Sequence, residues 1–304
     1  MAEALARAGL AHDVVLTTRA GEAAELAGAA VADGVRLVVA VGGDGTLHEL
    51  VNGVLGDADR APDGVMVGLV PAGRGSDYAR GLALDARPEV LVARFAAALD
   101  GDPAAVRRVD AGELTYAPTA LVAGRPVEPA SRLDGAAVRR FVNEAGFGFS
   151  TYVAQRTTRF PPALGAWLYT VAGVVTIIDW RHRALELTWD DGMTETRRIA
   201  TVELALGRFA GGGMLVAPDA DPADGLFDVM IVGEPGRLEL LTFSWRIRSG
   251  DHLRSPRVSV RRTARLDARV VDDGGPVYVQ ADGELLGREP FAARLLPGAL
   301  AFVG

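Results

Sequence analysis

The sequence predicts an α/β domain with a parallel sheet over residues 1–106, followed by a mostly antiparallel β domain over residues 107–304. The length of 304 residues fits about two domains of roughly 150 residues each. Strand and helix signals alternate in the first third, which is typical of a parallel sheet covered on both faces. Short apolar segments separated by turn residues follow, which is typical of antiparallel strands.

In the first third of the chain, each helix or strand is predicted by its own sequence pattern. Ala-rich composition predicts one helix, a Pro in the first turn marks another, and continuous apolar runs that end at Gly or Pro predict buried strands. The elements are, in order, the apolar run Val14–Leu16, a helix over 21–32, a strand over Val35–Val41, a helix over Leu47–Leu55, a strand over Val65–Val70 and a helix over Pro88–Leu99.

The second domain is predicted from alternating apolar positions. Its candidate strands are Val106–Leu114, Arg140–Ala145, Ala184–Thr188, Thr201–Leu206, Leu226–Val232, Val258–Val260, Val277–Gln280 and Ala292–Leu296. We expect the C-terminal segment to pack back on the first domain.

Residues 160–178 carry no charge, and this length approaches that of a membrane span. Pro161, Pro162 and Gly165 interrupt the stretch, and Asp179 and Arg181 end it. We therefore expect a buried or membrane-surface helix here and not a span.

The composition excludes several kinds of site. The chain has no Cys, and all 32 of its basic residues are Arg. Thiolate nucleophiles, thiolate metal sites, a Walker-type P-loop and a Schiff-base lysine are therefore excluded. The net charge of −7 argues against a general nucleic-acid binder, and the N-terminus lacks the profile of a secretory signal, so the cytoplasm is expected.

Arginines outnumber acids between residues 237 and 269. A solvated positive face is the favoured interpretation, and attraction to anionic lipid is the alternative. The span holds Arg237, Arg246, Arg248, Arg254, Arg257, Arg261, Arg262, Arg265 and Arg269 against Glu239, Asp251 and Asp267.

The strongest chemical signal is the turn Gly42-Gly43-Asp44-Gly45-Thr46, where a buried strand ends and a helix begins at once. Glycines allow a ligand to approach the backbone, and a helix N-terminus offers free N–H groups, so this arrangement suits a phosphate. Because a carboxylate and a phosphate repel each other, Asp44 would face phosphates only if a metal ion bridges the two groups. The alternative role for Asp44 is that of a helix cap.

A second turn, Gly73-Arg74-Gly75-Ser76-Asp77, repeats the strand, glycine turn and helix. Two such turns at neighbouring parallel strands would open into one crevice that a polyphosphate could span. Neither turn completes a dinucleotide fingerprint, which argues against a dehydrogenase. No Gly-x-Ser-x-Gly nucleophile elbow occurs, which argues against a hydrolase of that type.

The sequence resembles the diacylglycerol kinase catalytic domain family, which includes bacterial lipid kinases and sphingosine kinases. The resemblance covers nearly the whole chain in order. It rests on Gly42–Glu49 with Val51-Asn52-Gly53, the Pro71–Arg80 turn, Phe141–Gly148, Gly165–Tyr169, Ala217–Val229, Gln280–Glu284 and Leu296–Leu300.

This resemblance implies a Rossmann-like parallel sheet of the NAD-kinase/diacylglycerol-kinase type and a β-sandwich-like second domain. It implies transfer of the γ-phosphoryl group from Mg-ATP to a lipid hydroxyl, with diacylglycerol as acceptor and phosphatidate as product, by a cytoplasmic enzyme at the inner face of the membrane. The glycine turns would bind the nucleotide.

The resemblance also implies roles for single residues. Asp282 would take the proton of the lipid hydroxyl, and Glu284 would help to organise the site. Asp44 would organise magnesium and phosphate. Asp224, assisted by Asp221, would bind a structural magnesium.

Two departures from the family pattern bear on activity. The family's second loop usually reads Gly-Thr-Gly-Asn-Asp, and Arg74 and Ser76 replace its Thr and Asn. Arg74 is expected either to grip phosphate or to fill part of the nucleotide site. The family opens with a strand and an Asn-Pro loop, whereas Met1–Leu10 resembles the helix that follows them, so the given chain is expected either to begin late or to lack that part of the site.

Two other functions stay open. NAD kinases also carry Gly-Gly-Asp-Gly, so a soluble-metabolite kinase is one alternative. The other is a degenerate kinase fold that binds lipid or nucleotide without turnover. The sequence also leaves open whether the chain forms a homodimer.

Overall fold

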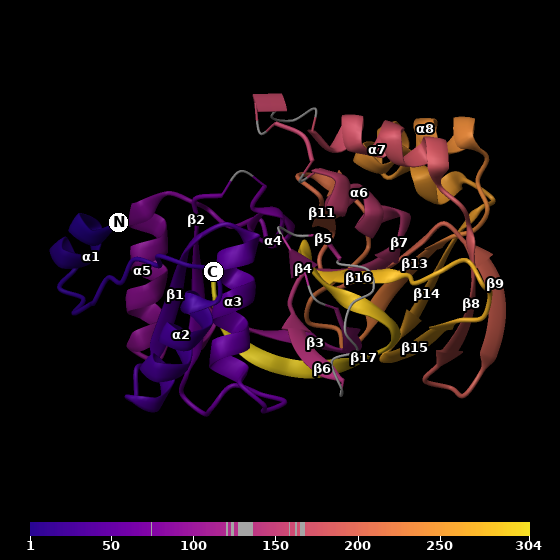
Figure 1. Ribbon diagram of the computed structural model, residues 1–304. Coiled ribbons are helices and arrows are strands. Elements are labelled where there is room, and N and C mark those ends of the chain that lie inside the picture. Colours follow the sequence, from indigo (N-terminus) through magenta and orange to yellow (C-terminus); the bar gives the residue numbers. More distant parts are fainter. Residues whose placement is uncertain are drawn as a thin grey trace.

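The computed structural model describes residues 1–73, 75–119, 121–122, 125–126, 136–157, 159–161, 163–164 and 168–304. An α/β part and a β part lie side by side, with both ends of the chain on the α/β part (Figure 1). The boundary between residues 106 and 107 stays a prediction.

The α/β part is built on a parallel strand pair. Strands β1 (Leu37–Gly42) and β2 (Met66–Pro71) pair in register from Leu37 opposite Met66 to Gly42 opposite Pro71. The helices are α1 (Ala2–Arg7), α2 (Glu22–Ala32), α3 (Asp44–Leu55), α4 (Asp77–Gly81) and α5 (Pro88–Leu99). The apolar run Val14–Leu16 forms no strand and is exposed.

The helices cover the two faces of this sheet and bury separate apolar clusters. Leu47 and Val51 of α3 pack in one cluster with Leu69 of β2, and Leu91 and Phe95 of α5 pack in another. These clusters hold the carboxyl ends of β1 and β2, where the predicted glycine turns begin, on a rigid base.

The β part is largely antiparallel. Its strands are β3 (Val106–Pro118), β4 (Leu121–Val122), β5 (Arg125–Pro126), β6 (Ala137–Phe141), β7 (Glu144–Gly148), β8 (Arg183–Trp189), β9 (Thr194–Ile199), β10 (Thr201–Ala205), β11 (Phe209–Ala210), β12 (Met214–Leu215), β13 (Phe227–Val232), β14 (Val258–Thr263), β15 (Arg265–Val270) and β16 (Tyr278–Ala281). With β17 (Glu284–Val303), the main sheet of the described chain runs β14-β13-β10-β7-β16-β17-β15-β8-β9. The predicted strand over Arg140–Ala145 is wrong in one respect, because the chain leaves β6 after Phe141 and enters β7 at Glu144.

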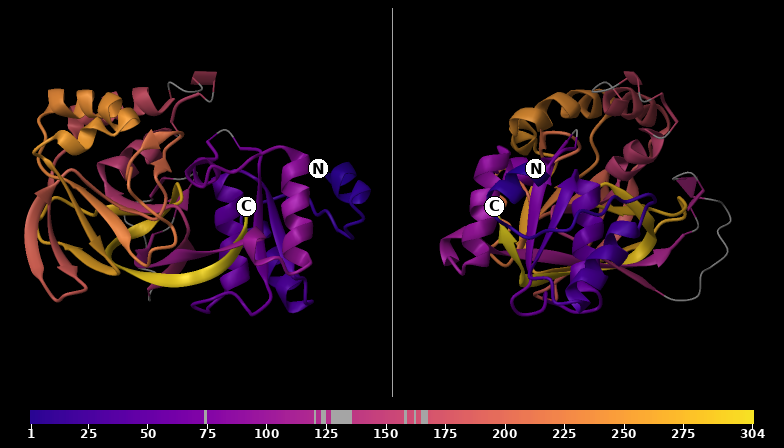
Figure 2. Two further views of the ribbon diagram at one scale, coloured as in Figure 1. Left: turned by 180° about the vertical axis from the view of Figure 1, so that it is seen from behind. Right: turned by 90° about the vertical axis from the view of Figure 1, so that its left-hand side faces the viewer.

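Strand β17 (Glu284–Val303) joins the two parts. It pairs antiparallel with β16, β15 and β3, and its last residues, Ala301–Val303, pair parallel with β2. The yellow strand curves from the β part into the α/β sheet in both views of Figure 2. The final residues of the chain therefore complete the sheet that carries the two glycine turns.

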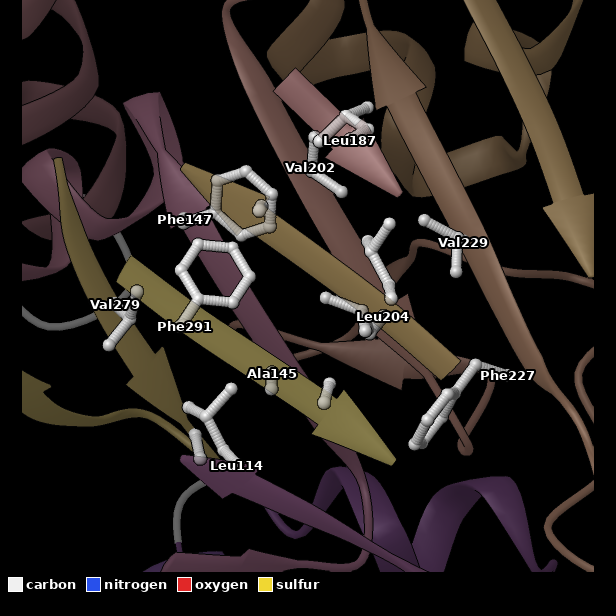
Figure 3. Packing of buried hydrophobic residues seen from close by; sticks show 14 of the residues in the cluster. Leu114, Ala145, Phe147, Leu187, Val202, Leu204, Phe227, Val229, Val279 and Phe291 are labelled. Carbon is white, nitrogen blue, oxygen red and sulfur yellow. The ribbon is translucent and has the colours of Figure 1, made fainter. Parts of the chain in front are cut away.

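The core of the β part lies between opposing strands of this curved sheet. Phe147 of β7 and Phe291 of β17 meet with ring centroids 4.2 Å apart, and Leu204 and Val229 belong to the same apolar cluster (Figure 3). Alternation along β10 sends Val202 and Leu204 into this core and turns Glu203 to the other face.

Three helices and two short 3₁₀ turns complete the described fold: α6 (Phe149–Thr157), α7 (Leu168–Asp179), α8 (Arg237–Ser249), and the turns at Pro103–Ala105 and Asp251–Arg254. Helices α7 and α8 lie side by side over the β part (Figure 1). Among the described helices, none has both the length and the apolar composition needed to cross a membrane.

Candidate active site between the two parts

The two glycine turns lie against each other. Because β1 and β2 are parallel and in register, both turns leave the same edge of the sheet, with Gly42 opposite Pro71. A Cβ atom on Gly43 would lie 3.2 Å from the Cα atom of Gly73, and a Cβ on Gly73 would overlap with Gly43 Cα. The backbones of the two turns can approach this closely only because neither residue has a side chain.

Asp44 links the two turns. Its carboxylate accepts hydrogen bonds from the backbone N–H groups of Asp77 (3.0 Å) and Tyr78 (3.1 Å) at the start of α4. Asp44 thus caps α4 while it begins α3. The carboxylate has further lone pairs, so a cation bound to phosphate could still be coordinated there.

Asp77 is buried behind this link. Its carboxylate accepts hydrogen bonds from Arg80 Nη1 and from the backbone N–H of Gly212, both at 2.7 Å. Burial raises the pKa of the Asp77 carboxyl. Asp77 therefore fixes the second turn to the β11–β12 hairpin of the β part.

The rest of the second turn is held locally. Ser76 has a φ of 48°, in the left-handed region, and its Oγ donates to the carbonyl of Gly73 at 3.3 Å. A Cβ on Gly75 would lie 3.4 Å from Asp44 Oδ2. Arg74 lies outside the described residues, so its two predicted roles stay predictions.

A polar pocket of about 430 Å³ opens beside the first turn. It is lined by Gly45, Thr46 and Glu49 together with Thr17, Thr18, Arg19, Ala20 and Ala23. Residues 17–20 were absent from the predicted site. Their signal is a pair of threonines and an arginine directly before the N-terminus of α2, which repeats the placement of the two glycine turns before a helix.

Asp282 lies in the β16–β17 turn and reaches α3 of the other part. Its carboxylate accepts backbone hydrogen bonds from Val142 (3.1 Å), Asn143 (2.9 Å) and Glu144 (3.1 Å). The Nδ1 atom of His48 lies 2.9 Å from Asp282 Oδ2, and the exposed fraction of the Asp282 side chain is 1%. The position of this carboxylate is therefore fixed by groups from both parts, and His48 is a contact that the sequence did not predict.

Glu284, two residues farther on, is exposed and faces the first turn. Its Oε1 lies 3.5 Å from where a Cβ on Gly45 would stand. The structure thus brings Asp44 to the junction of the two parts together with Asp282 and Glu284, which lie far from it in the sequence.

Asp221 and Asp224, the predicted metal ligands, each pair with an arginine. Asp221 Oδ1 lies 2.5 Å from Arg107 Nη2, and Asp224 forms an ion pair with Arg262. Within the described ranges, no three metal-ligating side chains form a cluster. Since each carboxylate is neutralised by its own guanidinium, the pair does not fit a magnesium site in this arrangement.

A pair of carboxyl groups is buried behind Asp282. Glu144 and Glu203 share a hydrogen bond, Gln280 Nε2 donates to Glu144 (2.6 Å), and Thr201 Oγ1 donates to Glu203 (2.9 Å). Gly146 leaves room for the pair, because a Cβ there would overlap with the Glu203 carboxylate. Burial raises the pKa of Glu203 to about 7 and that of Glu144 well above its ordinary value.

We expect Glu203→Gln to stabilise the protein at pH 8 and to have little effect at pH 5. The folded-state pKa of Glu203 is raised, so its contribution to stability is present at low pH and is lost as pH rises through about 7. Glutamine mimics the protonated acid at every pH, and the expected gain at pH 8 is on the order of 2 kcal/mol. Urea unfolding of both proteins at the two pH values measures this difference. An equal difference at both pH values would contradict it.

Comparison with known proteins shows the family. Residues 1–109 match the diacylglycerol kinase catalytic domain, and residues 143–304 match the YegS C-terminal NAD kinase beta sandwich-like domain. The chain belongs to the diacylglycerol kinase family. This diacylglycerol kinase family member is 30% identical to a probable lipid kinase YegS-like protein of Xanthomonas campestris pv. campestris, over 92% of the chain and 82% of the relative.

Other members of the diacylglycerol kinase family match over similar lengths. The diacylglycerol kinase of Bacillus subtilis is 26% identical over 94% of the chain and 82% of that protein. A putative diacylglycerol kinase structure from Bacillus anthracis superposes with a TM-score of 0.69 at 19% identity, over 100% of the chain and 89% of that structure. The predicted family and fold class are confirmed, and so is the class of enzyme, a phosphotransferase with an alcohol acceptor.

Proposed function

We propose that this lipid kinase transfers the γ-phosphoryl group of ATP to the hydroxyl of diacylglycerol and forms phosphatidate. The observation that carries this proposal is the meeting of the Asp282–Glu284 turn with the first glycine turn, where Glu284 faces Gly45 and Asp282 contacts His48. This contact supports a carboxylate that acts on the acceptor hydroxyl beside the turn that would bind the nucleotide. Relatives that span most of the chain and are named diacylglycerol kinase support the acceptor.

The nucleotide would lie along the glycine turns. The N-terminus of α3 offers free N–H groups to phosphate oxygens, and the pocket beside Thr17–Ala20 has room for another part of the nucleotide. Magnesium held by ATP would neutralise phosphate charge, and Asp44 is the residue that fits it. Proteins that catalyse phosphoryl transfer act mainly by positioning the substrates and neutralising the phosphate charge.

The acceptor hydroxyl would approach from the side of the β part. Asp282 is the proposed base, and the hydroxyl must replace one of the four donors that hold its carboxylate. Exposed Glu284 would orient the hydroxyl or the phosphate-bound cation next to Gly45. Hydrogen bonds of this kind tighten or exchange when substrates bind, so the buried position of Asp282 is compatible with this role.

The test is transfer of radiolabelled γ-phosphate from Mg-ATP to a panel of lipids in mixed micelles, with NAD as a soluble acceptor in parallel. A labelled phosphatidate product would support the proposal. Label on another lipid would correct the acceptor, label on NAD alone would favour the metabolite kinase, and an ATP-dependent rise in melting temperature without any transfer would favour the degenerate fold.

We expect Gly73→Ala to raise the KM for ATP by at least about tenfold, because the new methyl group would push the two turns apart at the phosphate site. Gly173→Ala is the matched control, since a Cβ on Gly173 meets nothing within 4 Å. Initial rates against ATP concentration measure the change. An unchanged KM in the Gly73 variant would show that the contact between the turns does not shape the nucleotide site.

A further inference from the structure

Helix α8 has two apolar faces. Leu240 and Ile247 are buried against the β part, in one cluster with Met230 of β13. On the opposite side, Leu238 and Trp245 have exposed fractions of 79% and 67%. Together with Leu241 they form an outward stripe at spacings of three and four residues.

Helix α7 has the same arrangement. Ile177 is buried in the cluster that also holds Leu240 and Ile247, so both helices pack on the same layer. Val174, Val175 and Ile178 are exposed, Ile178 by 66%. Since α7 and α8 contact each other (Figure 1), the two stripes form one apolar surface, the α7/α8 face, made of Val174, Val175, Ile178, Leu238, Leu241 and Trp245.

Arginines flank this surface. At about 100° per residue, Arg237 and Arg248 lie on one side of the α8 stripe and Arg246 on the other. No ion pair joins these three to another residue within the described part of the chain. The strand arginines of the same span do have acidic partners: Arg261 pairs with Asp191, Arg262 with Asp224, Arg265 with Asp267 and Arg269 with Glu186. The arginine-rich span thus includes paired strand residues and a positive rim on α8, and outside both Arg254 pairs with Asp251.

Helix α8 is also connected to the candidate active site. It packs on β12, whose hairpin partner β11 contacts α4. At the tip of that hairpin, the backbone N–H of Gly212 donates to Asp77, the residue that holds the second glycine turn. The α7/α8 face is therefore linked through packed elements to the second glycine turn.

We propose that the α7/α8 face docks on an anionic membrane surface, an inference that rests on the proposed lipid kinase function. An apolar stripe with an exposed Trp, between flanks of cations, is the arrangement of helices that lie in a bilayer interface. The rim is positive on a protein with a net charge of −7, which selects an anionic occupant over a second copy of the chain. Docking would hold the enzyme at the surface where a diacyl lipid resides.

The test is sedimentation with vesicles of phosphatidylcholine alone or mixed with phosphatidylglycerol. We expect wild-type protein to bind the mixed vesicles and L238S/W245S to bind at least about tenfold more weakly, because two apolar side chains no longer enter the interface. R246Q/R248Q should lose binding to mixed vesicles and R87Q/R94Q, with the same change in net charge, should keep it. V138S is the control for an exposed apolar residue elsewhere, with an exposed fraction of 44%.

Activity assays distinguish a failure of the docking proposal from a failure of the proposed lipid kinase function. Short-chain diacylglycerol dispersed in detergent should be phosphorylated equally by wild type and L238S/W245S, whereas diacylglycerol in mixed vesicles should be phosphorylated well only by wild type. No phosphorylation of either substrate would refute the acceptor and leave the vesicle binding to stand alone. The docking proposal would be overturned by wild-type binding of L238S/W245S and R246Q/R248Q, or by no binding of the wild type. A dimer that L238S/W245S dissociates without a change in vesicle binding would also overturn it.

Discussion

Asp282→Asn is expected to lower kcat by at least about a hundredfold, the lower range for the loss of a general base. The amide cannot take the proton of the acceptor hydroxyl. One of its two terminal atoms becomes a donor that faces the N–H groups of Val142, Asn143 and Glu144 or the ring of His48. The measurement is phosphatidate formation at saturating ATP.

The Asp282 carboxylate also ties the two parts together, so stability must be measured beside activity. Asp273→Asn, at an exposed position nine residues earlier, controls for the loss of one carboxylate. His48→Gln removes the imidazole while Asp282 keeps its three backbone donors. If Asp282 is the base, His48→Gln retains far more activity than Asp282→Asn at equal melting temperature. Equal losses in both variants, in step with melting temperature, would show a structural link only.

Asp44→Asn is expected to lower kcat/KM for ATP by about a hundredfold and to raise the magnesium concentration needed for half-maximal rate. The amide can still accept one hydrogen bond from the N-terminus of α4, where the carboxylate accepts two. It also lacks the charge that attracts a cation. Rates measured over a grid of ATP and magnesium concentrations separate weaker nucleotide binding from weaker cation binding.

Asp33→Asn is the matched control, because Asp33 is an exposed acid at the end of α2. Loss of a helix cap alone would cost about 1 kcal/mol of stability and leave the magnesium requirement unchanged. A variant with that phenotype would return Asp44 to the role of a cap.

The sequence predicts those elements whose signal is local. The strands β1 and β2, which end at glycine and at proline, were predicted to within a few residues, because a continuous apolar run and the turn that follows it are both short-range patterns. The predicted burial is confirmed for β2, whereas in β1 only Ala40 is buried and Val41 is exposed. Strands β9 and β15 were missed. Thr194–Ile199 is rich in Thr, Arg and Glu and has little apolar character, and Arg265–Val270 lies in the arginine-rich span. Strand β9 forms a hairpin with β8, whereas the partners of β15, β8 and β17, come from other parts of the chain.

Strand β17 shows a second limit. Only Ala292–Leu296 was predicted, since Pro290 and Pro297 suggest breaks in a strand. The structure accommodates both prolines at shifts in register, between Arg288 and Phe291 and between Leu296 and Leu300. Helix α8 was missed because apolar residues on two faces obscure the single-sided period of a surface helix.

The candidate site divides in the same way. The glycine turns and their acids follow from spacing, whereas the contact of His48 with Asp282 joins residues 234 positions apart. Tertiary structure alone brings them together. The Glu144–Glu203 pair was likewise invisible, because each glutamate in sequence reads as an ordinary polar position of an alternating strand.

The course of β17 has a consequence for synthesis and for construction of fragments. Ala301–Val303 pair on one side with β2, from residues 66–68, and on the other with β3, from residues 106–108, so most of the chain is synthesised between neighbours in one sheet. The α/β part can reach its final hydrogen bonding only after the β part has emerged, and pairing over such separations is slow. A fragment cut after residue 106 would present the edge of β2 unpaired, with Met66–Gly68 open to aggregation.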